Sequence, residues 1–255
     1  MLKRGNMIHS ILIIGQSNMA GRGRVSEALP VSDPRIKVLR NGRWQNMFRP
    51  VNPDRAFSGV CLAESFAKKY VEEHNVELGI IPCADGGTSL LQWREGGLLY
   101  DHAVMQARLA ERTSTIVAVL WHQGEADCAP HLAEAYYDKA SAIFNALRRD
   151  LKLGDVPFIV GGLGDFLPER ESVNLYNYGA VNAQLQKLAE NDALIGFASA
   201  EGLTDNGDHL HFDAPSLYEF GERYYAEFLK LEKRDRVFLE KASPDDAVRS
   251  SMEAL

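Results

Sequence analysis

Five short apolar runs recur along the chain, and longer segments with helical spacing lie between them. The runs are rich in Ile and Val and lack alternating polar positions, which is typical of strands buried on both faces. They lie at Ser10–Ile14, Val76–Ile81, Thr115–Trp121, Pro157–Gly161 and Leu194–Ala198. Alternating strands and helices favour parallel strands joined by right-handed crossovers. We therefore expect a three-layer α/β/α protein with a parallel central sheet of about five strands.

Three segments carry apolar residues every three or four positions, as an amphipathic helix does. They begin at Leu62, Leu132 and Leu217, and Pro215 stands near the expected start of the last helix, where proline is tolerated. One insertion breaks the alternation. Residues 36–47 contain Asn41-Gly42, the favoured pair of a type I′ turn, and predict a hairpin. We expect this hairpin outside the main sheet, near the mouth of the site.

No internal repeat or low-complexity segment divides the chain. We therefore predict one domain over residues 1–231, with the hairpin as an insertion. The charged stretch over residues 232–255 is predicted to be an extension. It forms either a surface helix or a segment that packs on a neighbour, and the sequence leaves both open.

Composition excludes several classes of protein. Hydrophobic residues make up 45% of the 255 positions and charged residues 25%, as in an ordinary globular chain. The charge sum of 28 − 35 = −7 gives no basic face for nucleic acid. Cys61, Cys83 and Cys128 form no CxxC pair, so neither a zinc ribbon nor a disulfide framework is indicated. We predict no metal and no cofactor.

The apolar run at Ile11–Ile14 is shorter than the core of a signal peptide, and no stretch approaches the roughly 20 residues that span a bilayer. We therefore expect a cytoplasmic protein without a membrane partner, although secretion is not excluded if a leader has been removed. The sequence leaves a homo-oligomer open.

Four polar clusters each follow a predicted strand. Because ligands bind beyond the carboxyl ends of strands in open α/β sheets, the four are expected to converge on one crevice. The first cluster, Gly15–Gly23, fits neither the Walker motif nor the lipase motif GxSxG, since Ala20 and Met19 stand where glycines belong. What remains is Ser17 at a strand end. Ser17 is either a nucleophile or only a helix cap, and this segment does not decide.

The second and third clusters offer hydrogen-bond donors. Gly86-Gly87 either turns a backbone N–H toward a developing oxyanion or forms an ordinary turn, which is the better reading of that segment alone. Trp93 nearby is a sugar-stacking platform or a core aromatic. In the third cluster, Gln123 offers a side-chain donor and Glu125 a carboxylate, or both satisfy a local loop.

The fourth cluster, Asp205–Asp213, carries a candidate base. Asp208 and His211 stand three residues apart, so their side chains can meet in a turn. An aspartate that holds one imidazole nitrogen leaves the other free as a general base. His209 competes for this role, but we expect it on the opposite side as a solvated or supporting residue.

Together these blocks resemble a known group of enzymes. The segments GQSNMAGRG, GGTS with a following Trp, WHQGEAD and DxxHF run from Gly15 to Phe212. They are similar in order and interval to the SGNH hydrolase superfamily, and more specifically to carbohydrate esterase family 6 and the sialate O-acetylesterase-like group. The resemblance implies a flavodoxin-like α/β/α fold. It also implies a serine esterase of the acetylxylan or sialate O-acetylesterase type, acting on a small acetylated carbohydrate.

The resemblance also implies residue roles. Ser17 would be the nucleophile and His211 the general base, oriented by Asp208; Glu125 acts with Asp208 or instead of it. The oxyanion donors would be the backbone N–H groups of Ser17 and Gly87 and the side chain of Gln123. Substrate contacts are expected from residues near these blocks, namely Gln16, Asn18, Arg22, Thr88 and Trp93.

Two rival functions use the same residues. A metal-dependent hydrolase would take ligands from His122, Glu125, Asp208 and His211. It lacks an HExxH pair and leaves the serine block without a purpose. A non-catalytic carbohydrate-binding protein would need aromatic platforms but no triad, whereas every triad position is filled. The identity of the acylated sugar stays open, because the expected specificity loops, Arg24–Asn52 and Gly161–Asn177, carry no decipherable code.

Overall fold

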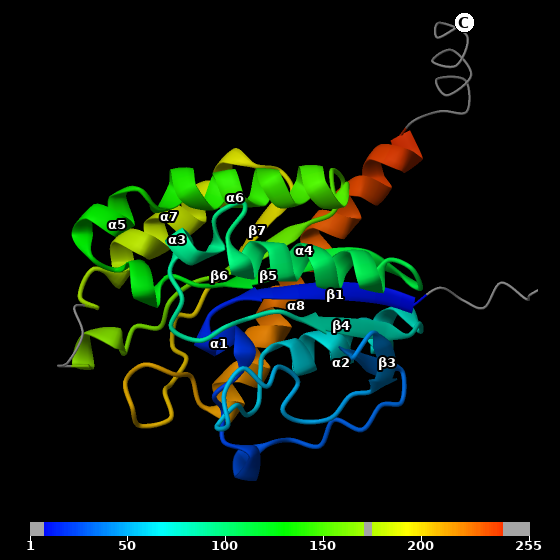
Figure 1. The fold of residues 1–255 in the computed structure, drawn as a ribbon, viewed down its shortest axis with the longest axis horizontal. Coiled ribbons are helices and arrows are strands. Elements are labelled where there is room, and N and C mark those ends of the chain that lie inside the picture. The colour runs from blue at the N-terminus through cyan, green and yellow to red at the C-terminus, as the bar shows by residue number, and fades with distance from the viewer. Residues whose placement is uncertain (1–7, 171–174, 242–255) are drawn as a thin grey trace, which may run out of the picture.

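The computed structural model describes residues 8–170 and 175–241, with side chains up to residue 232 (Figure 1). Its centre is a seven-stranded sheet with strand order β3-β2-β4-β1-β5-β6-β7. The strands are β1 (Ile8–Gly15), β2 (Ile36–Arg40), β3 (Arg43–Asn46), β4 (Leu78–Pro82), β5 (Ser114–His122), β6 (Phe158–Gly161) and β7 (Ile195–Ala198). All neighbours are parallel except β2 and β3. The predicted α/β architecture is confirmed, and the sheet has two more strands than expected.

The two extra strands are the predicted hairpin. Asn41 and Gly42 both have positive φ, at 49° and 72°, as a type I′ turn requires. The expectation that the hairpin lies outside the main sheet is wrong, because β2 pairs in parallel with β4 and β3 forms the edge. Ile36 and Val38 are fully buried by this pairing. Removing these apolar side chains from water is the physical reason that the hairpin extends the sheet.

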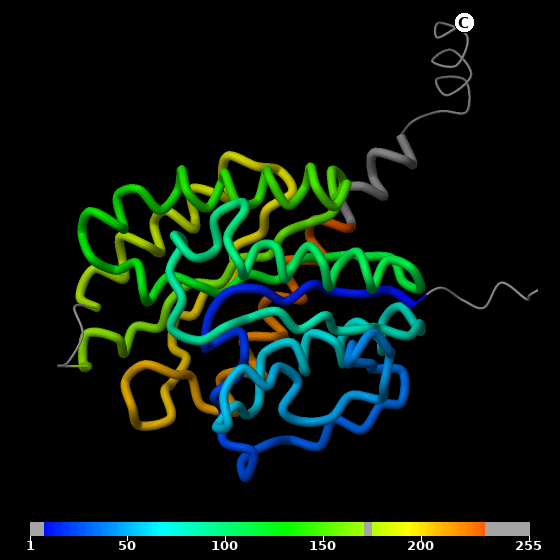
Figure 2. Tube along the Cα trace, in the orientation of Figure 1, coloured from blue at the N-terminus to red at the C-terminus, as the bar shows by residue number. Residues whose placement is uncertain are grey.

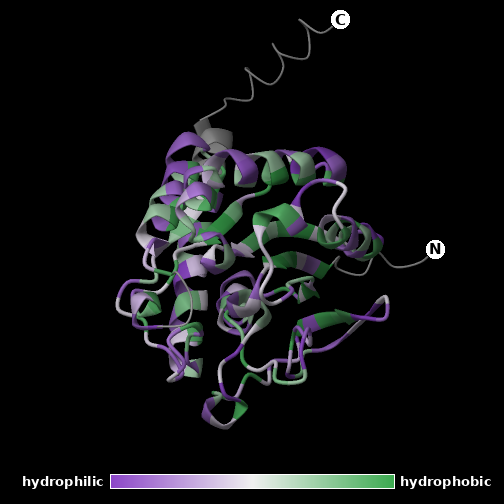
Figure 3. Cartoon of the chain, turned by 60° about the vertical axis from the view of Figure 1, so that its left-hand side comes forward, coloured by the Kyte–Doolittle hydropathy of each residue, from purple (hydrophilic) through white to green (hydrophobic). Residues whose placement is uncertain are grey.

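Helices cover both faces of the sheet (Figure 1). One face carries α2 (Ala63–His74) and α8 (Ala214–Lys241), which also pack on each other. The other face carries α3 (Leu90–Trp93), α4 (Leu98–Ala110), α5 (Pro130–Glu134), α6 (Tyr136–Leu151) and α7 (Tyr178–Asn191). Apolar residues concentrate in the strands and on the inner sides of the helices (Figure 3). The three predicted helical stripes are therefore confirmed as core-facing surfaces.

The last helix, α8, runs without a break through residue 231, where the extension was expected to begin, as far as Lys241. Residues 242–255 lie outside the described residues. Within the described part, no helix is long and apolar enough to cross a membrane. The short helix α1 (Ser17–Ala20) follows β1, and the segment before α8 returns beside it (Figure 2). This juxtaposition brings residues almost two hundred positions apart to one edge of the sheet.

Candidate active site

Ser17 stands at the carboxyl end of the central strand β1, just after a sharp turn. Gly15 has φ +127°, and a Cβ on it would lie 2.0 Å from the carbonyl oxygen of His122 on β5. The backbone N–H of Gln16 donates to that same oxygen at 2.8 Å. Only glycine fits so close to the neighbouring strand. The turn therefore fixes Ser17 as the first residue of α1, at the edge where the polar clusters meet.

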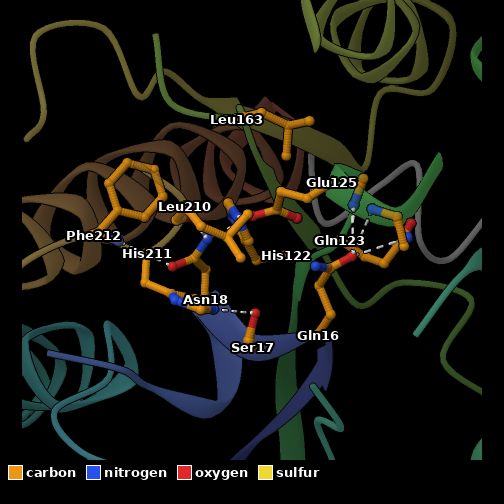
Figure 4. Close-up of polar contacts among 12 residues, drawn as sticks. Gln16, Ser17, Asn18, His122, Gln123, Glu125, Leu163, Leu210, His211 and Phe212 are labelled. Atoms are coloured by element: carbon orange, nitrogen blue, oxygen red, sulfur yellow. Dashed lines mark hydrogen bonds and ion pairs between the residues drawn. The ribbon is translucent and has the colours of Figure 1, made fainter. Parts of the chain in front are cut away.

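The Ser17 hydroxyl lies within proton-transfer distance of His211. The Ser17 Oγ is 3.0 Å from His211 Nε2 (Figure 4). On the other side of the ring, His211 Nδ1 is 2.6 Å from Asp208 Oδ2. The other Asp208 oxygen accepts the backbone N–H groups of Leu210 and His211, at 2.9 and 2.8 Å. These bonds fix the position of the carboxylate beside the His211 ring. The three side chains form a continuous Asp–His–Ser relay.

The electrostatics of Asp208 suit this arrangement. Burial raises the pKa of its carboxyl, but the backbone N–H donors and the His211 imidazole outweigh burial and hold the pKa below its usual range. An ionised Asp208 keeps the proton on Nδ1 of His211, which leaves Nε2 as the acceptor facing Ser17. His209 does not share this position, since its Nδ1 lies 3.4 Å from Glu169 and 3.6 Å from Asp205. The choice of His211 over His209 agrees with this geometry.

Glu125 does not contact His211. It is buried, and its Oε1 accepts from Asn18 Nδ2 at 2.5 Å and lies 3.2 Å from His122 Nε2. Burial raises the pKa of Glu125, but His122 and the Asn18 amide outweigh burial and lower it overall. Glu125 therefore reaches the relay only through Asn18.

The Asn18 side chain forms hydrogen bonds to the backbone on both sides of His211. Its Nδ2 also donates to the Leu210 carbonyl at 3.1 Å, and its Oδ1 accepts the Phe212 N–H at 3.1 Å (Figure 4). The side chain is 1% exposed. The expectation that Asn18 binds substrate is therefore wrong for this structure, because the amide is fully engaged inside the protein. Its geometry is that of a residue that positions the His211 loop.

A glycine turn lies beside Ser17 and carries a backbone N–H group without an acceptor among the described residues. The Gly86-Gly87 turn packs against Ser17, since a Cβ on Gly86 would lie 3.4 Å from Ser17 Cβ. Asp54 Oδ2 accepts the Gly86 N–H at 2.8 Å and so holds this turn. The N–H groups of Ser17 and Gly87 donate to no other group in the described parts of the chain. Both are available to a ligand oxygen beside the Ser17 hydroxyl.

The side-chain amide expected beside them is Gln123, and its geometry does not support direct donation. Gln123 is fully buried, and its Nε2 donates to Asp127 Oδ2 at 2.6 Å and to the Thr88 carbonyl at 3.1 Å. An amide nitrogen has two hydrogens, and these two acceptors take both. Burial raises the pKa of Asp127, which lies beneath the amide. The expected oxyanion role of Gln123 is therefore corrected to one of bracing the Thr88 and Asp127 segments.

Gln16 holds a free amide nitrogen instead. The backbone N–H groups of Gly124 and Ala126 both approach Gln16 Oε1, at 3.4 Å each, and Gln123 Nε2 lies 3.3 Å from it. Backbone N–H groups can only donate, so they fix which end of the amide is the oxygen. Gln16 is 3% exposed, and its hydrogen bonds within the described residues all involve Oε1, so Nε2 is left without a protein acceptor. In Figure 4 this nitrogen lies on the side of the amide away from Gln123.

Three further residues expected to touch substrate are engaged elsewhere. Arg22 is 7% exposed and forms a bidentate ion pair with Asp54, at 3.0 and 2.7 Å. Thr88 Oγ1 donates to the Asp85 carbonyl at 2.7 Å and accepts from Trp93 Nε1 at 3.0 Å. Trp93 is 1% exposed and packs edge-to-face on Trp121. The sugar-platform reading of Trp93 is wrong, because the ring belongs to the core.

The ligands of the rival metal site are already bound to one another. His122 is fully buried between Glu125 and the Tyr224 hydroxyl, while His211 lies between Asp208 and Ser17. In the part of the chain that the structure describes, no group of three or more His, Cys, Asp or Glu side chains is arranged to hold a metal ion. These positions give no support to the metal-dependent reading.

A serine beside a carboxylate-oriented imidazole, at the carboxyl edge of an α/β/α sheet, is the arrangement of a serine hydrolase. Comparison with known proteins makes the class specific. The family described as carbohydrate esterase, sialic acid-specific acetylesterase, matches residues 8–230, and the chain belongs to this family. It is a carboxylic ester hydrolase of the carbohydrate esterase type, as the resemblance in the sequence implied.

Individual relatives agree with this assignment. The Arabidopsis thaliana protein named "Probable carbohydrate esterase At4g34215" is 30% identical over 233 residues, which cover 82% of this chain and 86% of that protein. Its X-ray structure gives a TM-score of 0.79 at 25% identity, covering 88% of this chain and 98% of that one. The crystal structure of NanS gives 0.71 at 19% identity, covering 89% and 98%.

A carbohydrate acetylesterase from Xanthomonas citri gives a TM-score of 0.64 at 18% identity, covering 85% of this chain and 55% of that one. At such identities the likeness to NanS and to this enzyme shows the fold alone. Lipase and acylhydrolase structures share the fold as well. The SGNH-type α/β/α fold predicted from the sequence is thereby confirmed.

Proposed function

We propose that this protein removes O-acetyl groups from carbohydrates by a two-step acyl transfer on Ser17. The observation that carries the proposal is the relay from Asp208 through His211 to the Ser17 hydroxyl, with contacts of 2.6 and 3.0 Å. A serine hydroxyl is a weak nucleophile at neutral pH and needs a base within such reach. The family assignment supplies the substrate class, an acetyl ester on a sugar.

In the first step, Ser17 Oγ attacks the acetyl carbonyl carbon while His211 Nε2 takes the hydroxyl proton. The tetrahedral intermediate collapses as the C–O bond to the sugar breaks, and His211 returns the proton to the leaving sugar oxygen. In the second step, His211 takes a proton from water, whose oxygen attacks the acetyl–Ser17 ester. Acetate leaves and the proton returns to Ser17 Oγ, so the enzyme is restored.

Three donors would stabilise the negative oxygen of each intermediate. Two are the backbone N–H groups of Ser17 and Gly87, which have no other acceptor among the described residues. We assign the third to Gln16 Nε2 in place of Gln123, since the Gln123 hydrogens are taken by Asp127 and Thr88. Loss of one such donor lowers kcat by about 10²–10³ in a well-measured protease.

The acid of the triad is assigned to Asp208. It is the carboxylate that contacts His211 Nδ1, whereas Glu125 contacts Asn18 and His122. Glu125 would act as a positioning residue, because Asn18 carries its effect to the backbone on both sides of His211. The sequence left the acid of the triad open between Asp208 and Glu125, and in this proposal the two carboxylates have different roles.

The decisive test is acetate release by the wild-type protein and by Ser17→Ala. The substrates are an acetylated xylo-oligosaccharide and 9-O-acetyl sialic acid, assayed side by side, with p-nitrophenyl acetate as a small reference ester. Wild type should release acetate from at least one of the sugars, and Ser17→Ala should lose at least about 10³-fold in kcat on every substrate. If Ser17→Ala has the same kcat as the wild-type protein, the assignment of Ser17 as the nucleophile is wrong. Binding of acetylated sugars without acetate release would favour the non-catalytic alternative.

A further inference from the structure

An exposed aromatic ring stands beside the catalytic relay, in a loop that the sequence motifs do not include. Phe57 is 70% exposed, and the centroid of its ring lies 5.2 Å from the Arg22 guanidinium carbon. Arg22 covers one face of the Phe57 ring. The exposed surface of the side chain is therefore its edge and the opposite face. A phenyl face held in this way is open to a ligand with an apolar face of its own.

The support under this ring is rigid. Arg22 is buried and bound through both terminal nitrogens to Asp54. Asp54 also accepts the Ser58 hydroxyl at 2.7 Å and the Gly86 N–H at 2.8 Å. The residue next to Phe57 and the glycine turn are thus tied to the same carboxylate. A preorganised platform loses little side-chain entropy when a ligand binds to it.

The same contacts place the ring close to the Ser17 side chain. A Cβ built on Gly86 would meet Arg22 Nη2 at 2.5 Å on one side and Ser17 Cβ at 3.4 Å on the other. The guanidinium that supports Phe57 and the side chain of Ser17 therefore both lie beside the same glycine. A sugar whose acetyl group is at Ser17 can reach Phe57 with an adjoining part of its ring system.

Hydrogen-bonding groups lie at the edge of this platform. Arg55 donates to Asp85 Oδ1 at 2.7 Å and to the Gly86 carbonyl at 3.0 Å, and both side chains of the pair are about one third or more exposed. A cavity of about 260 Å³ beside the loop is lined in part by Asp54 and Asp85. Arg22 and Arg55 are each paired with a carboxylate, so the platform offers donors and acceptors without an uncompensated cation.

We propose that Phe57 and the Arg55–Asp85 pair form a sugar subsite that takes an uncharged pyranose ring of the acetylated substrate. The C–H face of the ring packs on Phe57, and its hydroxyls bond to Arg55 and Asp85. This is the combination of one apolar surface with a few polar groups that small-molecule sites use. The proposal rests on the proposed esterase function and adds to it the recognition of the sugar.

The test compares Phe57→Ala with a matched control, Phe48→Ala. Phe48 is also an exposed phenylalanine over an arginine, 5.2 Å from Arg40, but it lies after the edge hairpin. With acetylated xylobiose, Phe57→Ala should raise KM about 10-fold, and Phe57→Tyr should restore it. With p-nitrophenyl acetate, which has no pyranose ring, kcat/KM should stay within about twofold of wild type. Phe48→Ala should leave both substrates unchanged.

Three results would overturn the subsite. They are an unchanged KM for acetylated xylobiose in Phe57→Ala, an equal loss on both substrates, and a loss confined to 9-O-acetyl sialic acid, which is an anion. None of these results depends on whether Ser17 is the nucleophile. If instead the wild-type protein releases no acetate from any sugar, or Ser17→Ala is fully active, the proposed function itself fails.

Discussion

Within the described residues, two histidine rings contact a carboxylate three positions away, and one of these pairs also contacts the proposed nucleophile. In the loop over residues 205–213, Asp208 precedes His211, and the ring points at the Ser17 hydroxyl. In the segment after β5, the order is reversed and Glu125 follows His122. The second pair is the more deeply buried of the two. Spacing along the chain therefore does not decide which pair is catalytic.

The difference lies in what surrounds each pair. His122 is enclosed by β5, Tyr224 and two phenylalanine rings, and the hydroxyl beside its ring is the buried phenol of Tyr224 rather than a serine. His211 is partly exposed at the edge where β1 ends. The loop over 205–213 thus contacts the reacting group directly. The segment over 122–127 contacts Gln16 and Asn18, the two neighbours of Ser17.

The largest effect expected from this comparison is that of Asp208→Asn. The amide cannot hold the Nδ1–H tautomer of His211 as a carboxylate does, so Nε2 no longer accepts the Ser17 proton. We expect kcat to fall by about 10³–10⁴, as in the corresponding change of a serine protease. Steady-state acetate release measures this loss. His209→Ala is the matched control and should retain at least about half of the activity; an active Asp208→Asn enzyme would return the acid role to Glu125.

The contact of Ser17 with His211 and Asp208 could be expected from the sequence because its signal is local. Ser17 follows an apolar strand and a glycine, and Asp208 and His211 lie within one turn of chain. The sheet was predictable for a similar reason, since a buried parallel strand is a continuous apolar run. These local patterns do not show which side chains from distant parts of the sequence contact one another in the folded protein.

The errors illustrate this limit. From the sequence Trp93 could be a sugar platform or a core aromatic, and in the fold it is buried against Trp121. Phe57 is a single aromatic in a polar loop, and the sequence does not show the stacking on Arg22 on which its proposed role rests. Gln123 and Gln16 are chemically identical, and the backbone donors that orient Gln16 come from a different strand end.

The next effect in size is that of Gln16→Glu. This change keeps the oxygen that accepts from Gly124 and Ala126 and replaces the free amide nitrogen with a second oxygen, which cannot donate. We expect kcat to fall about 10²-fold with little change in KM, because the donor acts on the transition state. Kinetics with p-nitrophenyl acetate and an acetylated sugar should agree. If Gln16→Glu has the same kcat as the wild-type protein, Gln16 is not an oxyanion donor, and the two backbone N–H groups are the donors that remain.

A smaller effect is expected for Glu125→Gln. The variant keeps an acceptor for Asn18 but removes the charge, so the His211 loop is held less firmly. We expect kcat to fall about 10-fold, far less than in Asp208→Asn, with KM unchanged. The acid limb of the pH–rate profile should keep its wild-type midpoint, because the His211–Asp208 contact is intact. A loss as large as that of Asp208→Asn would show that Glu125 is the acid of the relay.

The smallest expected effect is the pH dependence of stability in that same variant. Since the pKa of Glu125 is lower in the folded protein than its usual value, its carboxylate stabilises the fold above the unfolded pKa of about 4.3. This contribution is lost as pH falls through the lower folded pKa. The free energy of unfolding of wild type should exceed that of Glu125→Gln by about 1 kcal/mol at pH 7, and the two should converge below about pH 4. Urea unfolding across pH 3–7 measures both curves. Curves that diverge at acid pH would mean that Glu125 is protonated in the fold, and that an uncharged hydrogen bond to Asn18 holds the His211 loop.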